Sequence, residues 1–494
     1  MTNHHASFDV NAIAYRAVID AGFVPDSPPA VQEELRTLQS QPPAGATTSD
    51  ARDLRSLLWS SIDDRKSRDL DQVEYAETLP NGDIRILVGI ADVDALVQKG
   101  SAIDLHAAEN TTSLYTGFRT FPMLPEELST DKTSLVGGAD RASIVTELIV
   151  ATDGTVKSSD IFSAVLHNYA KLSYEGVAAW IDEQGPMPTE VASVPGMEAQ
   201  IHLQLTAAQR LRDFRKEHGA LELDTIQANP VVNSEGRVTD LSVVERNSAR
   251  ELIENFMIAA NVAMAEFLKA KGVASIRRVV RTPEHWPGIV EIAEDAGDKL
   301  PAQPDARALA DFLARQKVKD PEHFPDLSLA IVKLMGPGEY TVLKPGDLTT
   351  SAETGHFGLA VHDYTHSTAP NRRYADLVTQ RLVKAAIANA PSPYTDSELA
   401  AIAAHCTERE DAARKLERKM RKVGAALLLR DRVGEQFEAI VTGVTPKGTF
   451  ARLCKPPVDG RVMRGEHGLR VGQKVRVKLL ATDPARGFID FGRV

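Results

Sequence analysis

Apolar side chains recur at helical spacing in two short stretches near the start of the chain. Residues 9–23 and residues 28–39 each place their apolar side chains on one face of a helix. The run QPPAGATTSD, residues 41–50, then interrupts the pattern with residue types typical of a linker. We therefore expect a small helical module at residues 1–48, which is either helix-turn-helix-like or a docking element for the rest of the chain.

The region 50–430 begins with runs typical of strands and continues with stretches typical of helices. The strand-like runs include DIRILVGIADV, ASIVTELIVA and GTVKSSDIFSAVL. The helical stretches include ARELIENFMIAANVAMAEFLKAKG, RRYADLVTQRLVKAAIANA and residues 396–430. Strands followed mainly by helices predict a mixed α/β domain.

The last part of the chain, residues 434–494, alternates apolar and polar side chains, with glycines at the expected turns. Five short strands in about 60 residues predict an all-β barrel of the OB-fold type, a fold that often binds single-stranded nucleic acid. A barrel that serves only for packing is the alternative.

Charge is distributed unevenly between this barrel and the rest of the chain. The whole chain has a net charge of −11, yet residues 434–494 carry 11 Lys and Arg against six Asp and Glu. The predicted barrel is therefore at +5 and the remainder at −16. Because phosphate backbones attract clustered cations, the basic barrel indicates RNA binding by this part of the chain.

The overall composition is that of an ordinary globular protein, with 43% hydrophobic and 25% charged residues. The longest apolar runs fall well short of the roughly 20 residues that a membrane helix needs, so no membrane partner is expected. Two cysteines, Cys406 and Cys454, are too few for a disulfide framework or a cysteine zinc site. With no basic region followed by an apolar stretch at the N-terminus, we expect a cytoplasmic protein without a secretory signal.

One stretch, SIDDRKSRDLDQVEY at residues 61–75, is rich in carboxylates. Asp69 and Asp71 are two residues apart and point to the same side of an extended chain, and Asp63 can return to them through a polar turn. Mg²⁺ and Mn²⁺ prefer such oxygen ligands, and a pair of these ions can activate water for phosphodiester hydrolysis. The alternative is a solvated charged loop.

A second stretch, YTHSTAPNRRYADLVTQRL at residues 364–382, is rich in arginine. Arg372 and Arg373 lie near the expected N-terminus of a helix, and Arg381 follows two to three turns later. Guanidinium groups suit phosphate oxygens and the charge of a phosphoryl transition state, although a surface ion-pair network would have the same composition. His366 is a candidate general base, and a structural histidine is the alternative.

Together, these segments resemble the ribonuclease II (RNB) family. IDDRKSRDLDQ is similar to the acidic motif of the family, YTHSTAPNRRYADLVTQRL to its arginine-rich signature, and IADVDALVQKGSAIDLHA with PMLPEELS to its intervening core. The resemblance implies an RNB-type catalytic domain at residues 50–430 and a terminal OB-fold RNA-binding domain. It also implies a processive 3′-to-5′ exoribonuclease of RNA degradation or processing, which hydrolyses single-stranded RNA to nucleoside 5′-monophosphates with Mg²⁺, or with Mn²⁺ as a substitute.

The resemblance assigns the metal and catalytic residues. Asp63, Asp69 and Asp71 stand where the family has ligands of metal or water, and Asp71 is expected to be indispensable. Together with Asp69 and Asp71, the arginines Arg372 and Arg373 complete the expected catalytic set.

Gln72 departs from the family, which has a fourth aspartate at this position. Its amide oxygen can ligate a cation but brings no charge, so one metal should bind more weakly unless another carboxylate, such as Asp64 or Asp92, takes its place. This departure leaves open a catalytically weakened RNA-binding protein, and a DNA exonuclease with the same metal chemistry is a third reading.

The resemblance also implies contacts with RNA. Tyr115 matches an aromatic residue that stacks on a base near the 3′ end, and Tyr174 and Glu254 match residues that contact the terminal ribose. Arg381 is expected to bind RNA. Many relatives carry two cold-shock-type barrels before the body, and the helical module at residues 1–48 is too short to hold even one.

Overall fold

The computed structural model describes residues 9–40, 51–226, 228–233, 235–244, 246–347, 355–446 and 448–494. The predicted linker, residues 41–50, lies outside these ranges. The two predicted N-terminal helices are present as α1 (Val10–Asp20) and α2 (Pro29–Gln39). Helix α1 packs on the long helix α13 (Asp396–Leu429), whereas α2 packs on α3 (Ala102–Asn110). Because the two helices contact different parts of the body, the arrangement favours a docking element over a helix-turn-helix-like unit.

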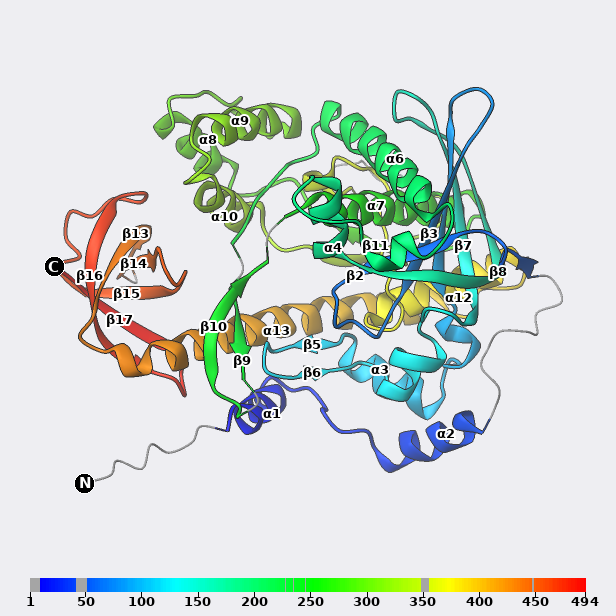
Figure 1. Cartoon of the computed structure of the whole chain (residues 1–494), viewed down its shortest axis with the longest axis horizontal. Coiled ribbons are helices and arrows are strands. Elements are labelled where there is room, and N and C mark those ends of the chain that lie inside the picture. The colour runs from blue at the N-terminus through cyan, green and yellow to red at the C-terminus, as the bar shows by residue number, and fades with distance from the viewer. Residues whose placement is uncertain are drawn as a thin grey trace.

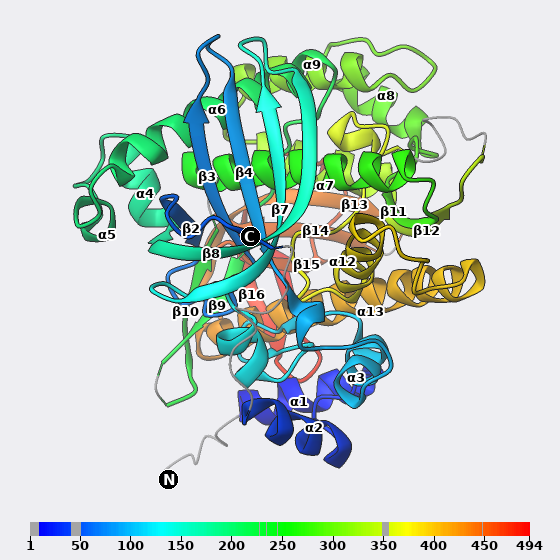
Figure 2. The ribbon, with the colours of Figure 1, turned by 90° about the vertical axis from the view of Figure 1, so that its right-hand side faces the viewer.

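A twisted sheet forms the centre of the body (Figure 2). Within the described residues its strands follow the order β1 (Arg52–Asp53), β8 (Val156–Ser173), β2 (Trp59–Asp63), β3 (Gln72–Thr78), β4 (Ile84–Ala91) and β7 (Asp140–Val150). Strands β1 and β2 run parallel to β8, and the other pairs are antiparallel. Because β7 also pairs with β8, the sheet curls back on itself.

Helices pack on both faces of the sheet and extend the body to one side (Figure 1). Besides α3 and α13 they are α4 (Tyr174–Ile181), α5 (Thr189–Ala192), α6 (Met197–Glu217), α7 (Ser248–Ala270), α8 (Trp286–Asp295), α9 (Ala306–Lys319), α10 (Phe324–Met335) and α12 (Tyr374–Ile387). Helices α8, α9 and α10 share an apolar core of their own. No helix in the described ranges combines the length and the apolar character that a membrane crossing requires.

Short elements connect these parts. The strand pairs are β5 (Leu114–Tyr115) with β6 (Thr120–Phe121), β9 (Ala228–Val232) with β10 (Val238–Val243), and β11 (Ser275–Val279) with β12 (Glu339–Leu343). Single helical turns are η1 (Val93–Ala95), η2 (Leu128–Lys132), η3 (Phe357–Leu359) and η4 (Arg430–Arg432). Helix α13 begins with a capping box, in which Thr395 and Glu398 satisfy each other's backbone N–H groups.

The sheet separates two apolar cores, and alternation along each strand decides which core a side chain joins. In β3, Val73 joins the core that includes α12, whereas Ala76 joins the core that includes α6 and α7. Gln72 and Glu74 have the same parity in the strand as Ala76, so they lie on the face covered by α6 and α7.

A closed barrel ends the chain. In the described part of the chain its strands pair in the order β13 (Gln436–Thr445), β14 (Gly448–Leu453), β15 (Asp459–Arg464), β17 (Phe488–Arg493) and β16 (Lys474–Asp483). Its apolar core includes Leu429 from the end of α13, and ion pairs join Arg452 to Asp326 at 2.9 Å and Lys474 to Glu322 at 3.0 Å. The mixed α/β body and the closed barrel confirm the fold class predicted from the sequence.

Candidate active site

The acidic stretch forms a loop that leaves the sheet at the end of β2 and returns to it at the start of β3. Leu70 is buried and anchors the loop, since its N–H donates to the Ser134 hydroxyl at 2.9 Å. The carbonyl of Asp71 accepts from the Ala91 N–H at 2.9 Å, which joins the chain to the ladder of β4. The loop therefore returns to the sheet, and the charges of Asp63 and Asp69 both act on the guanidinium group of Arg372.

Asp71 is the most deeply enclosed of these aspartates, with 0% of the residue exposed. Its Oδ1 atom accepts from the Asn371 backbone N–H at 3.0 Å, and its Oδ2 atom accepts from Nε of Arg372 at 3.0 Å. Burial raises the pKa of the Asp71 carboxyl to about 7, although the Arg372 charge opposes this shift. The acidic and arginine-rich motifs, which are 301 residues apart at this contact, thus meet directly.

Asp63 and Asp69 stand beside this ion pair and are less enclosed. One oxygen of Asp63 accepts from the Asp64 N–H at 2.6 Å and from the Ser67 hydroxyl at 3.1 Å. Burial raises the pKa of the Asp63 carboxyl, and the Arg372 charge opposes the shift. Asp69 is partly exposed, and its charge acts on Asp71 and Arg372. Among the described residues, Asp71 is the one of these three that forms an ion pair with Arg372, whereas Asp63 and Asp69 act on it only through their charge.

Gln72 begins β3, where it pairs with Ile90 of β4, and only 3% of it is exposed. Asp64 and Asp92, the two acidic residues that could replace the missing charge, each form an ion pair already. Asp64 forms an ion pair with Arg250 at 2.6 Å, and Asp92 forms one with Lys384 at 2.8 Å. Neither carboxylate is therefore available without breaking an existing ion pair.

The three predicted arginines have different surroundings. Arg372 is at the acidic loop, with 43% of its side chain exposed. Arg373 immediately precedes α12, near the predicted start of a helix, and binds Asp376 through Nε at 2.8 Å and Nη2 at 2.7 Å. Of the two, Arg372 is the one that directly contacts a predicted metal ligand.

Arg381 is a different case, because only 2% of its side chain is exposed. It forms ion pairs with Asp94 at 2.9 Å and Asp104 at 2.8 Å, and it donates to the Tyr394 hydroxyl at 2.8 Å. The structure therefore does not support the predicted RNA contact of Arg381. The guanidinium instead joins α12 to α3 and to the turn η1.

Tyr115 lies beside the acidic loop, and 44% of it is exposed. Burial of its hydroxyl raises the pKa of Tyr115 to about 12, and the nearby groups that act on it are Arg372, Asp69 and Asp71. A cavity of about 250 Å³ adjoins this residue and is lined by Thr112, Ser113, Tyr115, Arg372, Arg373, Glu410, Ala413, Arg414 and Glu417. The exposed ring and the arginines make this cavity suitable for a base with its phosphate.

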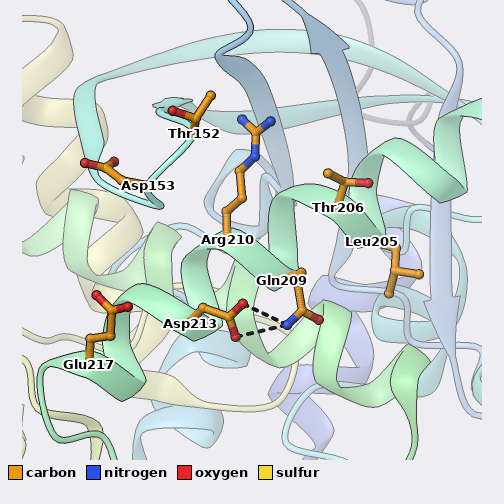
Figure 3. A pocket seen from close by; sticks show the side chains of 8 residues that line it. All are labelled: Thr152, Asp153, Leu205, Thr206, Gln209, Arg210, Asp213 and Glu217. Carbon is orange, nitrogen blue, oxygen red and sulfur yellow. Dashed lines mark hydrogen bonds between the residues drawn. The ribbon is translucent and has the colours of Figure 1, made fainter.

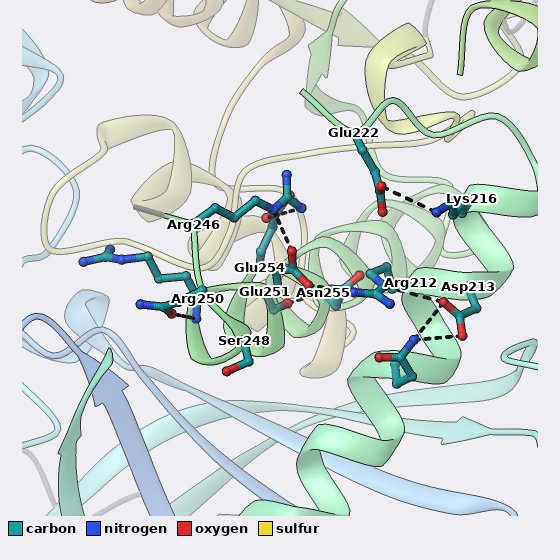
Figure 4. A network of polar contacts seen from close by, with 12 residues as sticks. Arg212, Asp213, Lys216, Glu222, Arg246, Ser248, Arg250, Glu251, Glu254 and Asn255 are labelled. Carbon is teal, nitrogen blue, oxygen red and sulfur yellow. Dashed lines mark hydrogen bonds and ion pairs between the residues drawn. The ribbon is translucent and has the colours of Figure 1, made fainter. Parts of the chain in front are cut away.

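Tyr174 begins α4 and Glu254 lies on α7. Burial raises the pKa of Tyr174, and the charge of Asp63 raises it further, while the Arg250 guanidinium lies over its ring at 4.2 Å from the centroid. Glu254 belongs to a polar network along the first turns of α7, in which Arg246 binds Glu251 at 2.8 Å and Glu254 at 3.4 Å (Figure 4). Tyr174 is therefore close to Asp63, whereas Glu254 is exposed and paired with Arg246.

His366 has the surroundings of a structural residue. Its Nδ1 atom is 2.8 Å from the Tyr340 hydroxyl, and its ring lies edge-on to those of Tyr340 and Tyr364. Burial and the charges of Arg373 and Arg278 lower the pKa of His366 well below its ordinary value. A neutral histidine whose Nδ1 atom is hydrogen-bonded to a tyrosine fits a structural role better than the role of a general base.

Glu74 is a further acidic residue near the site that sequence reasoning missed. Its residue exposure is 0%, and neither carboxylate oxygen has a hydrogen-bond partner. Burial raises the pKa of the Glu74 carboxyl well above its ordinary value, and the charge of Asp63 adds to the shift. The signal in the sequence is a glutamate in a buried strand position, two residues after Gln72.

The donor chemistry of the site fits a hard divalent cation, because Asp63, Asp69 and Asp71 supply carboxylate oxygens beside an oxygen-bearing amide. Across the ranges that the structure describes, however, no group of three or more His, Cys, Asp or Glu side chains is gathered closely enough to bind a metal as it stands. Asp71 is instead held by Arg372. A cation would therefore have to draw the carboxylates together and compete with this guanidinium.

A second cavity, of about 480 Å³, lies between the β7–β8 turn and α6 (Figure 3). It is lined by Thr152, Asp153, Leu205, Thr206, Gln209, Arg210, Asp213 and Glu217. Gln209 donates to both oxygens of Asp213 at 2.9 Å. None of the residues predicted for the site lines this cavity, so the site remains with the acidic loop.

Comparison with known proteins gives two family matches. Residues 51–389 match the RNB domain, and residues 435–494 match the RNase II-type exonuclease C-terminal S1 domain. Ribonuclease R of Thermotoga maritima is 29% identical over 473 residues, which cover 89% of this chain and 64% of that protein. The chain thus spans less than two thirds of the length of this relative.

Solved structures share the fold. Mycoplasma genitalium RNase R in complex with ribose-methylated single-stranded RNA superposes with a TM-score of 0.87 at 22% identity, over 99% of this chain and 78% of that chain. Yeast Ssd1, described as a pseudonuclease, superposes with a TM-score of 0.69 at 17% identity, over 92% and 56% of the two chains. The same architecture therefore occurs in a ribonuclease and in a pseudonuclease.

Proposed function

The chain belongs to the RNB family, and from this premise we propose that it is a 3′-to-5′ exoribonuclease that hydrolyses single-stranded RNA to nucleoside 5′-monophosphates in a processive manner. The observation that carries the proposal is the contact between buried Asp71 and Arg372 beside the cavity that Tyr115 and Arg372 line, with the charges of Asp63 and Asp69 also acting on Arg372. Mg²⁺ is the proposed cofactor, with Mn²⁺ as a substitute. A cytoplasmic location, expected from the sequence, belongs to the same proposal.

Asp63, Asp69 and Asp71 are the residues that would hold the metal, with Gln72 beside them. A bound divalent cation supplies an activated water and stabilises the leaving oxygen of the phosphodiester. Arg372 has the exposure needed to turn from Asp71 towards a phosphate oxygen.

Tyr115 offers an exposed ring on which a base can stack. We assign Tyr174 and Glu254 to the ribose of the terminal nucleotide, which provides a means to distinguish RNA from DNA. Because Arg250 and Arg246 hold these two side chains, their positions are set before RNA binds.

The barrel at the C-terminal end is the proposed second RNA contact. Arg461 and Arg464 are exposed on β15, and Phe488 is exposed at the start of β17. An exposed aromatic ring with neighbouring cations is a typical surface for single strands.

A catalytically weakened RNA-binding protein is the second candidate function. It is favoured by Gln72, which removes one charge from the acidic motif, and by carboxylates that are not gathered around a metal position in the part of the chain that the structure describes. The likeness in fold to a pseudonuclease agrees with this candidate.

One experiment separates the candidates. Uniformly labelled RNA and DNA of the same sequence are incubated with the protein and Mg²⁺, and the products are resolved by size. Mononucleotides from RNA alone support the exoribonuclease. Binding of RNA without products supports the weakened protein, and mononucleotides from DNA contradict the proposed preference for RNA.

A further inference from the structure

Glu74 lies in the strand that follows the acidic loop, on the same face as Gln72. Its cross-strand partner in β2 is Ser60, and β2 ends three residues later at Asp63. Since alternate residues of a strand share a face, Glu74 and Gln72 project to the side of α6 and α7 rather than towards α12. The glutamate is therefore displaced from Gln72 by two strand positions, or roughly 7 Å along the strand.

The carboxylate of Glu74 lacks the partners that buried carboxylates normally have. Both oxygens are enclosed, and neither accepts a hydrogen bond or forms an ion pair. Such groups are costly in a protein interior, so an unpartnered one is a common sign of a ligand or an ion at that position. The core on this face is largely apolar, and its nearest amide, that of Gln204, donates to the Glu74 backbone carbonyl at 3.3 Å rather than to the carboxylate.

The charged groups that act on Glu74 belong to the site. Asp63 ends β2 opposite Ser173, the residue before Tyr174, so Asp63 and Tyr174 lie at the same end of the sheet. Strand β2 also pairs with Glu74. In agreement, the charge of Asp63 acts on Glu74, and the charges of both residues act on the Tyr174 hydroxyl. The other two candidate carboxylates, Asp64 and Asp92, are bound to Arg250 and Lys384. Glu74 is thus a buried acidic residue beside the site whose two carboxylate oxygens have no hydrogen-bond partner and no ion pair within the described residues.

We propose that Glu74 supplies to the divalent-cation site the carboxylate that Gln72 lacks. The proposal rests on the proposed function in so far as it assumes a cation at Asp63. A glutamate is one methylene longer than an aspartate, and Mg²⁺ keeps several of its waters, so Glu74 acts on the cation either directly or through a bound water. The site then regains four carboxylates, one from the end of β2, two from the loop and one from β3.

Binding of Mn²⁺ alone tests this proposal without measuring catalysis. The variant is Glu74→Gln, and the matched control is Glu77→Gln, because Glu77 lies in the same strand but is paired with Arg85 at 2.8 Å. Isothermal titration with Mn²⁺ should show weaker binding by about tenfold or more for Glu74→Gln, the size of effect known for groups that support metal ligands. The Glu77→Gln control should keep the wild-type affinity.

A rescue variant tests whether the charge itself matters. In Gln72→Asp/Glu74→Gln the carboxylate returns to the family position, so Mn²⁺ affinity should recover. If Glu74→Gln binds Mn²⁺ as tightly as the wild type, the proposal is overturned. If Glu74→Gln folds poorly, Glu74→Leu replaces it, because leucine suits the apolar surroundings. The melting temperature of Glu74→Leu should then rise less on adding Mn²⁺ than that of the wild type. An equal rise overturns the proposal.

The RNA assay keeps this proposal separate from the proposed function. If the wild-type protein hydrolyses RNA while Glu74→Gln binds Mn²⁺ normally, the role of Glu74 is refuted and the exoribonuclease stands. If Glu74→Gln loses Mn²⁺ affinity and the wild type releases no nucleotides, the role of Glu74 stands and the exoribonuclease is refuted.

Discussion

Replacing Asp71 by Asn should separate the chemistry from folding and RNA binding. Asn keeps the shape of the side chain and an oxygen that can accept the Asn371 N–H, a bond that spans 3.0 Å. It removes the negative charge that faces Nε of Arg372, also at 3.0 Å. Because 43% of the Arg372 side chain is exposed, water can solvate this charge in the variant.

These contacts set the expected magnitudes. One hydrogen bond persists and the freed guanidinium is hydrated, so we expect the free energy of unfolding to fall by only about 1–2 kcal/mol. The carboxylate that ligates the cation is lost, and we expect hydrolysis to slow by a factor of at least about 100, equivalent to about 2.7 kcal/mol of transition-state stabilisation.

Three measurements on Asp71→Asn check this prediction: single-turnover hydrolysis of labelled RNA with Mg²⁺, RNA affinity by fluorescence anisotropy, and the melting temperature. Asp64→Asn is the matched control, because Asp64 is in the same loop but exposed and paired with Arg250. We expect the control to retain nearly the wild-type rate. Hydrolysis by Asp71→Asn at more than about a tenth of the wild-type rate, a loss below about 1.4 kcal/mol, would refute the catalytic role of Asp71.

Three further predictions concern other parts of the molecule. Replacing Arg461 and Arg464 by Gln should weaken RNA binding and reduce the slope of log affinity against log salt by roughly 0.7 per lost phosphate contact, and an unchanged slope would exclude the β15 surface as an RNA contact. Arg381→Met should cost about 3–5 kcal/mol of unfolding free energy in a denaturant titration, because it leaves Asp104 buried without its cation; a change below about 1 kcal/mol would contradict the structural role. Burial lowers the pKa of His356 to about 4 in the folded protein, whereas a histidine in the unfolded chain has a pKa of about 6.5. Below about pH 6.5 the unfolded chain therefore binds a proton that the folded protein does not, and the free energy of unfolding should fall as the pH drops. His356→Asn should flatten this decline between about pH 7 and pH 5, and an equally steep decline in the variant would argue against His356 as its source.

Much of the fold follows from residue patterns that are local in sequence. The helical spacing of residues 9–23 and 28–39 is realised in α1 and α2, and the alternation after residue 434 is realised in the barrel. Arg372 and Arg373 lie just before α12, close to the predicted start of a helix. Local spacing cannot predict which helix packs where, and the docking of α1 on α13 joins segments nearly 400 residues apart.

The parts of the site that sequence reasoning missed depend on contacts between distant residues. An arginine that binds phosphate and one that binds carboxylates look alike in a sequence, and the partners of Arg381 lie 277 and 287 residues away. Glu74 also owes its significance to contacts that its sequence position does not show. Its sequence position shows a glutamate in a strand, whereas its significance comes from the burial of both oxygens and from the closeness of Asp63.

The central claim is that the meeting of Asp71 and Arg372 marks the active site of a 3′-to-5′ exoribonuclease. The most direct test is a time course on single-stranded RNA that carries its label in the 3′-terminal nucleotide, with Mg²⁺ and with wild-type protein or Asp71→Asn. The account predicts that the wild type releases the label as a nucleoside 5′-monophosphate from the earliest time point, and that Asp71→Asn leaves the RNA intact. Label that first appears in longer oligonucleotides, or equal release by both proteins, would contradict it.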